Sequence, residues 1–225
     1  MTLEDCLNPP KVLFFLGHTP TAQGARTYEH EHEFSYNKKV MAHANRYLCD
    51  FRDNIKDGHA HFGEIEVHCS RQRIHFFHHN LRQFAQTFTG RLHNALLIEL
   101  HFNSFSRAAE GREILVRKTK GGLFGRVFKK RYLDDLYERL DTNIYPSKRR
   151  GWAGIRWVGP HDRGFGNLLS VDEFLGEDSI ATIFEPEFLS HKTKASVHYV
   201  ENPKRYGQQL ARWALAFTGI CRPAI

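Results

Sequence analysis

Three apolar runs along this chain end in side chains that suit metal binding or acid–base chemistry. They are Lys11–Leu16 before Gly17-His18, 94–100 before His101, and 179–184 before Glu185. Apolar runs of this length predict buried strands, and ligands of open α/β sheets bind beyond the carboxyl ends of such strands. A lone histidine at a strand end is more often a structural residue, but three coincident strand ends indicate one functional edge.

The rest of the chain shows helical periodicity, alternating segments and turn signals. Apolar residues recur at helical spacing in 34–55, 71–89, 132–140 and 202–218. Strand patterns occupy 63–69 and 110–117, and the charges that flank the second predict a position near the edge of a sheet. Small or Gly-rich residues predict loops at 19–25 and 160–169. No internal repeat or low-complexity linker indicates a second domain.

Composition and the first residues restrict the class of protein. The 225 residues are 41% hydrophobic and 13% aromatic, which is ordinary for a globular domain and excludes disorder as the main state. The four cysteines form no C-x-x-C pair, so free thiols in a reducing compartment are expected. Residues 1–10 have neither a basic segment nor an apolar one, and no apolar run is long enough for a membrane span. We therefore expect cytoplasmic synthesis without a signal peptide and no membrane insertion.

The charge balance favours an anionic partner. The formal net charge is +7, which suits nucleic acid, a lipid surface or an anionic polymer. Residues 118–131 are strongly basic, and 148–157 interleave cations with two tryptophans. Such a segment binds anionic chains or sugars, or forms a solvated surface loop. Because no recognised nucleic-acid motif is present, nucleic acid is not the expected partner, and the oligomeric state stays open.

Two histidines and a glutamate form a candidate zinc site. Zinc hydrolases commonly hold the ion with three protein ligands, and two His with one Glu is a known set. His18 and His101 supply the histidines, and the glutamate comes from the acidic run that holds Glu29, Glu31 and Glu33. Because a carboxylate near a helix start is also favoured by the helix dipole, these residues alone leave the choice of glutamate open.

A carboxylate is also needed to move protons between water and a leaving amine. Glu185 follows an apolar strand, so partial desolvation should raise its pKa toward neutral pH. Glu187 is a rival, because residues two apart on an extended chain point to the same face, although Pro186 should turn the chain between them. The other histidines match no motif and are expected mostly at the surface; they include His30, His32, His59, His61, His75, His78 and His79.

At these positions the chain resembles, over nearly its whole length, the zinc-dependent N-acetylmuramoyl-L-alanine amidases of the type 3 amidase family, found in bacterial autolysins and phage endolysins. The matching motifs are Gly17-His18, the small-residue loop 23–25, Glu33 with Asn37 four residues later, Leu100-His-Phe-Asn103, and Glu185 within Ile183-Phe-Glu-Pro-Glu-Phe-Leu-Ser190. Within the resemblance Glu33 is the glutamate ligand. The departures are Thr19 where glycine is common, the extra Glu187, and His191 where asparagine is usual.

The resemblance implies a fold, a cofactor and a reaction. The fold is α/β, a single catalytic domain over 1–225 with a central, mostly parallel, twisted sheet and helices on both faces. One zinc ion would be held by His18, Glu33 and His101, with Glu185 as the acid and base. The reaction is hydrolysis, by zinc-activated water, of the amide between N-acetylmuramic acid and the L-alanine of the peptidoglycan stem peptide. Asn103, Arg163 and Asn167 would bind the substrate.

The resemblance also suggests an endolysin-like enzyme that acts on the cell wall after release, without a separate wall-binding domain. Two alternatives remain at this point. One is another zinc peptidase or deacylase with the same ligands. The other is a non-enzymatic basic module that binds nucleic acid, which predicts no stoichiometric zinc.

Overall fold

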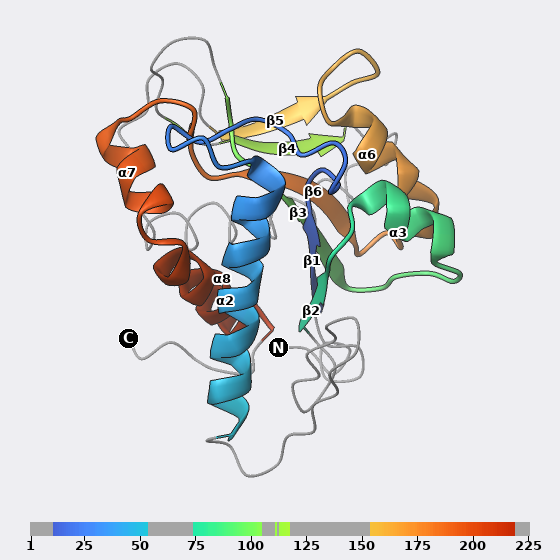
Figure 1. Cartoon of the computed structure of the whole chain (residues 1–225). Helices are drawn as coiled ribbons and strands as arrows, with labels where there is room; N and C mark the ends of the chain where they lie inside the picture. Colours follow the sequence, from blue (N-terminus) through green and yellow to red (C-terminus); the bar gives the residue numbers. More distant parts are fainter. Residues whose placement is uncertain (1–10, 54–73, 105–110, 112, 118–153, 219–225) are drawn as a thin grey trace.

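One mixed sheet of six strands forms the centre of the computed structural model, which describes residues 11–53, 74–104, 111, 113–117 and 154–218 (Figure 1). The strands are β1 (Lys11–Leu16), β2 (Ile74–Phe77), β3 (Ala95–Leu100), β4 (Glu113–Arg117), β5 (Gly154–Val158) and β6 (Ile180–Glu185). The helices are α2 (Glu33–Asp53), α3 (Leu81–Thr87), α6 (Phe165–Ser170), α7 (Lys194–Val200) and α8 (Pro203–Phe217), with a short 3-10 helix η2 (Asp172–Phe174).

The sheet has the order β2-β1-β3-β6-β4-β5, and its first four strands are parallel. β4 is antiparallel to β6 and parallel to β5. In register, Leu16 pairs with Leu100, and Leu100 pairs with Phe184. The strands β1, β3 and β6 are therefore neighbours whose carboxyl ends meet at one edge, which confirms the prediction made from the three apolar runs.

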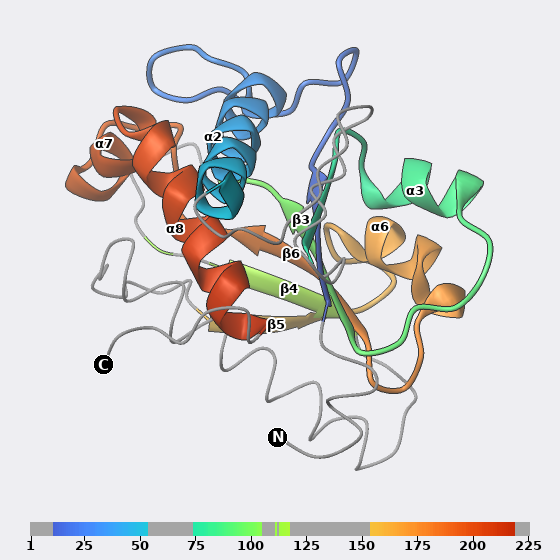
Figure 2. The ribbon, with the colours of Figure 1, turned by 90° about the horizontal axis from the view of Figure 1, so that it is seen from below.

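Side chains alternate between two cores, one on each face of the sheet. Phe14 and Ile98 face α2 and α8, whereas Phe15 and Leu97 face α3 and α6. Figure 2 shows this layering, with α2, α7 and α8 on one side of the strands and α3 and α6 on the other. Because both faces are covered, the central strands are apolar at nearly every position and show no polar alternation. The predicted α/β fold, with a mostly parallel sheet and helices on both faces, is confirmed.

The helix predicted over 71–89 was wrong in its first half. Ile74–Phe77 is the edge strand β2, and the helix α3 begins only at Leu81. Asn80 separates the two, because its side-chain oxygen accepts a hydrogen bond from the backbone N–H of Gln83 at 2.9 Å and caps the helix. The apolar residues of a strand and of the short helix after it can together resemble the periodicity of one long helix. The cap at Asn80 is the sequence signal that separates the two elements.

Three further local expectations also need correction. The segment 160–169, expected to be irregular, contains the start of α6, which follows Gly164 in the left-handed region at φ 80°. The strand β4 lies inside the sheet, because β5, expected to belong to a loop, forms the edge beyond it. Helix α7 was not predicted, although Thr193 caps it.

Some predictions fall outside the described residues. They are the strand expected at 63–69, the basic segment 118–131, the helix expected at 132–140 and residues 148–153.

Candidate active site

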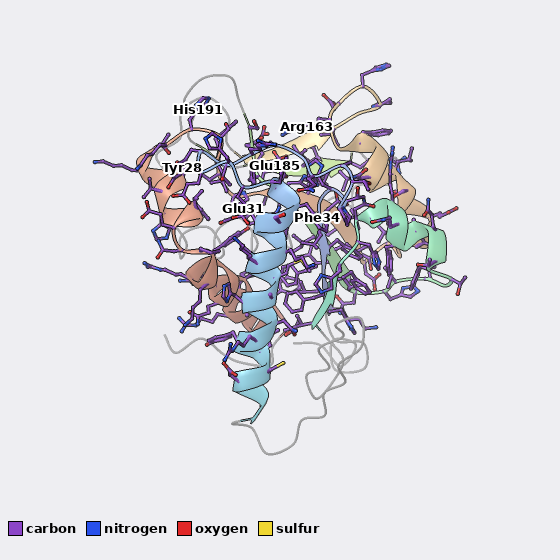
Figure 3. All side chains as sticks on the ribbon, viewed as in Figure 1. Tyr28, Glu31, Phe34, Arg163, Glu185 and His191 are labelled. Atoms are coloured by element: carbon purple, nitrogen blue, oxygen red, sulfur yellow. The ribbon has the colours of Figure 1, made fainter. Side chains whose placement is uncertain are left out.

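A cavity of about 370 Å³ opens at the sheet edge where β1, β3 and β6 end. His18, Glu33, His101 and Glu185 all line it. The ends of these three strands and the start of α2 therefore bring together four residues for which the sequence suggested metal binding or proton transfer. Figure 3 labels Glu185 and Arg163 in the upper part of the molecule, where α2 begins at Glu33, and both line the cavity.

Glu33 is the buried centre of the three candidate metal ligands. Its Oε1 lies 2.9 Å from His101 Nδ1, and its Oε2 lies 3.1 Å from His18 Nε2. The backbone N–H of Phe102 donates to Oε1 at 2.9 Å. Burial would raise the pKa of Glu33, but the hydrogen bonds with His101 and His18 outweigh burial and lower the pKa to about 2. Glu33 is therefore a carboxylate at neutral pH, as metal ligation requires.

His101 lies between two carboxylates. Its Nδ1 faces Glu33, and its Nε2 lies 2.7 Å from Glu99 Oε1. Burial alone would lower the pKa of His101, but the hydrogen bonds with Glu33 and Glu99 raise it to about 10. Because Nε2 is engaged by Glu99, Nδ1 is the nitrogen that faces the other ligand atoms.

Two glycines allow the histidines to approach one another and Glu33. A Cβ atom on Gly17 would lie 2.4 Å from His101 Nε2. Gly24 has φ +77°, and a Cβ atom there would lie 2.5 Å from His18 Nε2. His18 itself lies in the left-handed region at φ 65°, which is uncommon for a residue with a side chain and often marks a functional site. Gly17 and Gly24 thus permit close packing around the candidate ligands.

Helix α2 is held against the end of β3 by Asn37. The side-chain amide of Asn37 donates to the backbone oxygen of Leu100 at 3.0 Å, and the backbone N–H of Gly17 donates to the same oxygen at 2.9 Å. One carbonyl therefore fixes β1, β3 and the first turn of α2. This contact gives a physical reason for the pairing of Glu33 with an asparagine one turn later.

The donor atoms of His18, Glu33 and His101 lie within 4.8 Å of one another. Two imidazole nitrogens and one carboxylate oxygen form a donor set that suits zinc. Glu29 and Glu31 do not line the cavity, and Glu31 instead forms a 2.7 Å ion pair with Lys39. Of the three glutamates that spacing left open, only Glu33 belongs to this group of donor atoms.

Glu185 lines the same cavity from the end of β6, with a side chain only 3% exposed. Its Oε2 accepts a 2.5 Å hydrogen bond from Arg163, whose guanidinium also donates to Asn103 Oδ1 at 2.8 Å. Burial raises the pKa of Glu185 to about 7, although Arg163 acts in the opposite direction and Glu113 adds to the rise. A carboxyl group of this kind can both accept and release a proton near neutral pH.

Glu187 has different surroundings from Glu185. It is fully buried, and its Oε1 accepts hydrogen bonds from the backbone N–H groups of Gly111 at 2.8 Å and Phe188 at 2.9 Å. It does not line the cavity. The position of Glu187 therefore fits a structural role that holds the chain after β6.

The three candidate substrate-binding residues occupy distinct positions. Arg163 lines the cavity with a side chain 54% exposed. Asn167 also lines it, and its amide donates to Glu99 at 2.7 Å. Asn103 is buried. Its side chain accepts a hydrogen bond from Arg163 and donates one to Glu113, so it positions neighbouring side chains of the site.

Sequence reasoning overlooked Glu99, Glu113 and Arg82. Glu99 is the one charged residue of the apolar strand β3, and this isolated charge was the available signal. Glu113 pairs with Glu185 in register across β4 and β6, a relation that only the sheet order reveals. Arg82 comes from α3 and lines the cavity.

Some of the surplus histidines are also less exposed than expected. His75, His78 and His79 are partly buried, and His75 and His79 lie against the ring of Phe77. His30 is exposed, as predicted, whereas His59 and His61 lie outside the described residues.

Comparison with known proteins identifies the fold. No family model matches the sequence, and no curated protein matches it. The structure is similar to the N-acetylmuramyl-L-alanine amidase Ami1 from Mycobacterium smegmatis, with a TM-score of 0.60, 12% identity, and coverage of 95% of this chain and 100% of that chain. It is also similar to the catalytic domain of CwlV, an N-acetylmuramoyl-L-alanine amidase from Bacillus (Paenibacillus) polymyxa var. colistinus, with a TM-score of 0.52, 16% identity, and coverage of 94% and 99%.

The chain therefore has the fold of these amidase catalytic domains, and the likeness extends over nearly the whole length of both chains. None of the helices in the described part of the chain has the length and apolar character needed to cross a membrane.

Proposed function

We propose that this chain is a zinc-dependent N-acetylmuramoyl-L-alanine amidase that hydrolyses the amide between N-acetylmuramic acid and L-alanine in peptidoglycan. The observation that carries the proposal is a metal-type donor set, His18, Glu33 and His101, which shares one cavity with the buried carboxyl group of Glu185. The fold shared with amidase catalytic domains supports the choice of substrate.

One zinc ion held by the three ligands would act as a Lewis acid, lowering the pKa of water and polarising the amide carbonyl. The residues of the chain perform the remaining tasks. Glu185 takes a proton from the attacking water, whose oxygen bonds to the carbonyl carbon. As the carbon–nitrogen bond breaks, Glu185 gives this proton to the departing amine of L-alanine. Burial raises the pKa of Glu185 to about 7 in the metal-free chain, which supports its role as a proton acceptor.

The cavity offers cationic and amide groups to the substrate. We propose that Arg163 and Asn167 contact the bound peptide or glycan, because both line the cavity, and that Asn103 supports Arg163 through its 2.8 Å hydrogen bond. The net positive charge of the chain would favour approach to the anionic cell wall, where we propose that the enzyme acts after release from the cell that makes it.

Digestion of purified peptidoglycan tests the proposal. Zinc-loaded wild type should release stem peptides with a free N-terminal L-alanine, together with peptide-free glycan, as identified by mass analysis of the products. Glu185→Gln should release neither while keeping its zinc. Cuts inside the stem peptide, with the muramoyl amide intact, would instead indicate a zinc peptidase. A purified protein that takes up no zinc would contradict the proposal at its first step.

A further inference from the structure

Glu99 is a buried acidic side chain that the proposed mechanism does not use. It lies in β3, two residues before His101, and its side chain is 0% exposed. Residues two apart on an extended strand point to the same face. The His101 ring lies between the two carboxylates, with Nδ1 toward Glu33 and Nε2 toward Glu99. Burial of a carboxyl group costs free energy unless hydrogen-bond donors surround it. A buried glutamate beside a candidate metal ligand therefore indicates a specific function for its carboxyl group.

Three donors from different parts of the fold converge on Glu99. His101 Nε2 lies 2.7 Å from Oε1, and the amide of Asn167 donates to the same oxygen at 2.7 Å. The backbone N–H of Leu81 donates to Oε2 at 2.8 Å. Because a carboxylate only accepts hydrogen bonds, both of its oxygens are engaged and its orientation is fixed by α3 and α6.

This arrangement determines which nitrogen of His101 is available to a metal. A neutral imidazole carries one N–H and one lone pair, and the nitrogen that donates a hydrogen bond cannot ligate. Glu99 requires the N–H at Nε2. When metal binding releases the second proton of the ring, the lone pair is therefore on Nδ1, the atom that faces Glu33 at 2.9 Å.

We propose that Glu99 is a positioning residue for metal binding, which holds His101 with Nε2–H toward Glu99 and Nδ1 toward the metal. Asn167 and Leu81 fix Glu99 in turn, so the two helices on one face of the sheet support the metal ligand. The inference rests on the proposed metal site, and it goes beyond it by assigning the residue that orients the ligand. Metal-ligating histidines generally need such a partner, and its loss typically lowers metal affinity about 10–100-fold.

Glutamine cannot replace Glu99 without conflict. If its amide oxygen faces His101 and Asn167, its NH₂ group meets the N–H of Leu81, so two donors oppose each other. If the amide is turned, its NH₂ group faces His101 Nε2 and favours the N–H at Nδ1, the nitrogen needed for the metal. Either orientation should weaken metal binding without changing the size of the side chain.

Competition for zinc with a chromophoric chelator measures the effect without any substrate. Glu99→Gln should bind zinc about 10–100-fold more weakly than wild type. The matched control is Glu187→Gln, because Glu187 is equally buried but accepts from backbone groups and lies outside the cavity. This control should keep the wild-type affinity for zinc even if it is less stable. Asn167→Ala, which removes one donor to Glu99, should cause a smaller loss in the same direction.

The tautomer of His101 in the zinc-loaded wild type gives a readout that does not depend on any variant folding. Nitrogen NMR of the imidazole should show a proton on Nε2 and the metal on Nδ1. Zinc bound at Nε2, or equal zinc affinity in folded Glu99→Gln and wild type, would overturn this inference alone. Failure of the wild type to bind zinc would overturn both this inference and the proposed function.

Discussion

Replacing Glu185 by glutamine separates the ionisation of this side chain from its packing. Glutamine has nearly the same shape but cannot lose a proton, so the end of β6 should keep its structure. The side chain is 3% exposed, and burial raises the pKa of Glu185 from 4.5 to about 7 despite the opposing effect of Arg163. The same environment that suits proton transfer should therefore make the ionised group destabilising.

The sign and size of the effect follow from linkage between protonation and folding. A pKa that is higher in the fold than in the unfolded chain means that the fold prefers the protonated form. The stabilisation from this preference is complete below pH 4.5 and is lost as the pH rises to about 7. Above this pH, Glu185→Gln should exceed the wild type in free energy of unfolding by about 3 kcal/mol, because each tenfold change in proton affinity equals about 1.4 kcal/mol.

Urea unfolding of chelator-treated protein over this pH range measures the difference. The metal must be absent, because a nearby divalent cation would stabilise the carboxylate and lower the pKa of Glu185. Glu177, an exposed carboxylate in the turn before β6, supplies the control, and Glu177→Gln should follow the wild type at every pH. Adding zinc should reduce the difference between Glu185→Gln and wild type.

A difference in stability between Glu185→Gln and wild type that stays constant from pH 4.5 to 7, or that shrinks as the pH rises, would contradict the raised pKa of Glu185. Either result would mean that the Glu185 carboxylate is well solvated in the fold. The proposed proton transfer near neutral pH would then lose its physical basis.

Three further substitutions test the ligands, their packing and the core. Glu33→Ala should lose bound zinc in metal analysis, whereas Glu31→Ala, which removes only a surface ion pair, should retain it. Gly17→Ala places a Cβ 2.4 Å from His101 Nε2 and should lower both zinc content and stability, the latter by about 1–3 kcal/mol in urea unfolding. Phe14→Ala should lower the free energy of unfolding by about 3–5 kcal/mol, because the ring is fully buried; a smaller cost would indicate a looser core than the structure shows.

The strand ends could be predicted from sequence because their signal is local. β1 is buried on both faces, so its apolar run leaves little choice of element, and the polar residue that follows it marks the edge. The choice of Glu33 was different, since spacing alone left three glutamates open. The resemblance selected Glu33, and the structure explains the selection through contacts to His18 and His101.

Contacts between distant segments could not be predicted. Glu99 gains its role from Asn167 and Leu81, which lie 68 and 18 residues away along the chain. Glu113 reaches Glu185 only because β4 runs antiparallel beside β6, and no periodicity encodes that order. Short helices could not be predicted for another reason. α3 and α6 span fewer than two helical turns, so their apolar periodicity is hardly repeated, and capping at Asn80 and the turn at Gly164 decide where they begin.

Hydrolysis of a defined muramoyl peptide in water enriched in heavy oxygen tests the central claim most directly. Zinc-loaded enzyme should place one heavy oxygen in the lactyl carboxylate of N-acetylmuramic acid and none in the released peptide, whose L-alanine should carry a free amine. Heavy oxygen in a carboxylate of the peptide would contradict the account, because water would then have attacked a different amide.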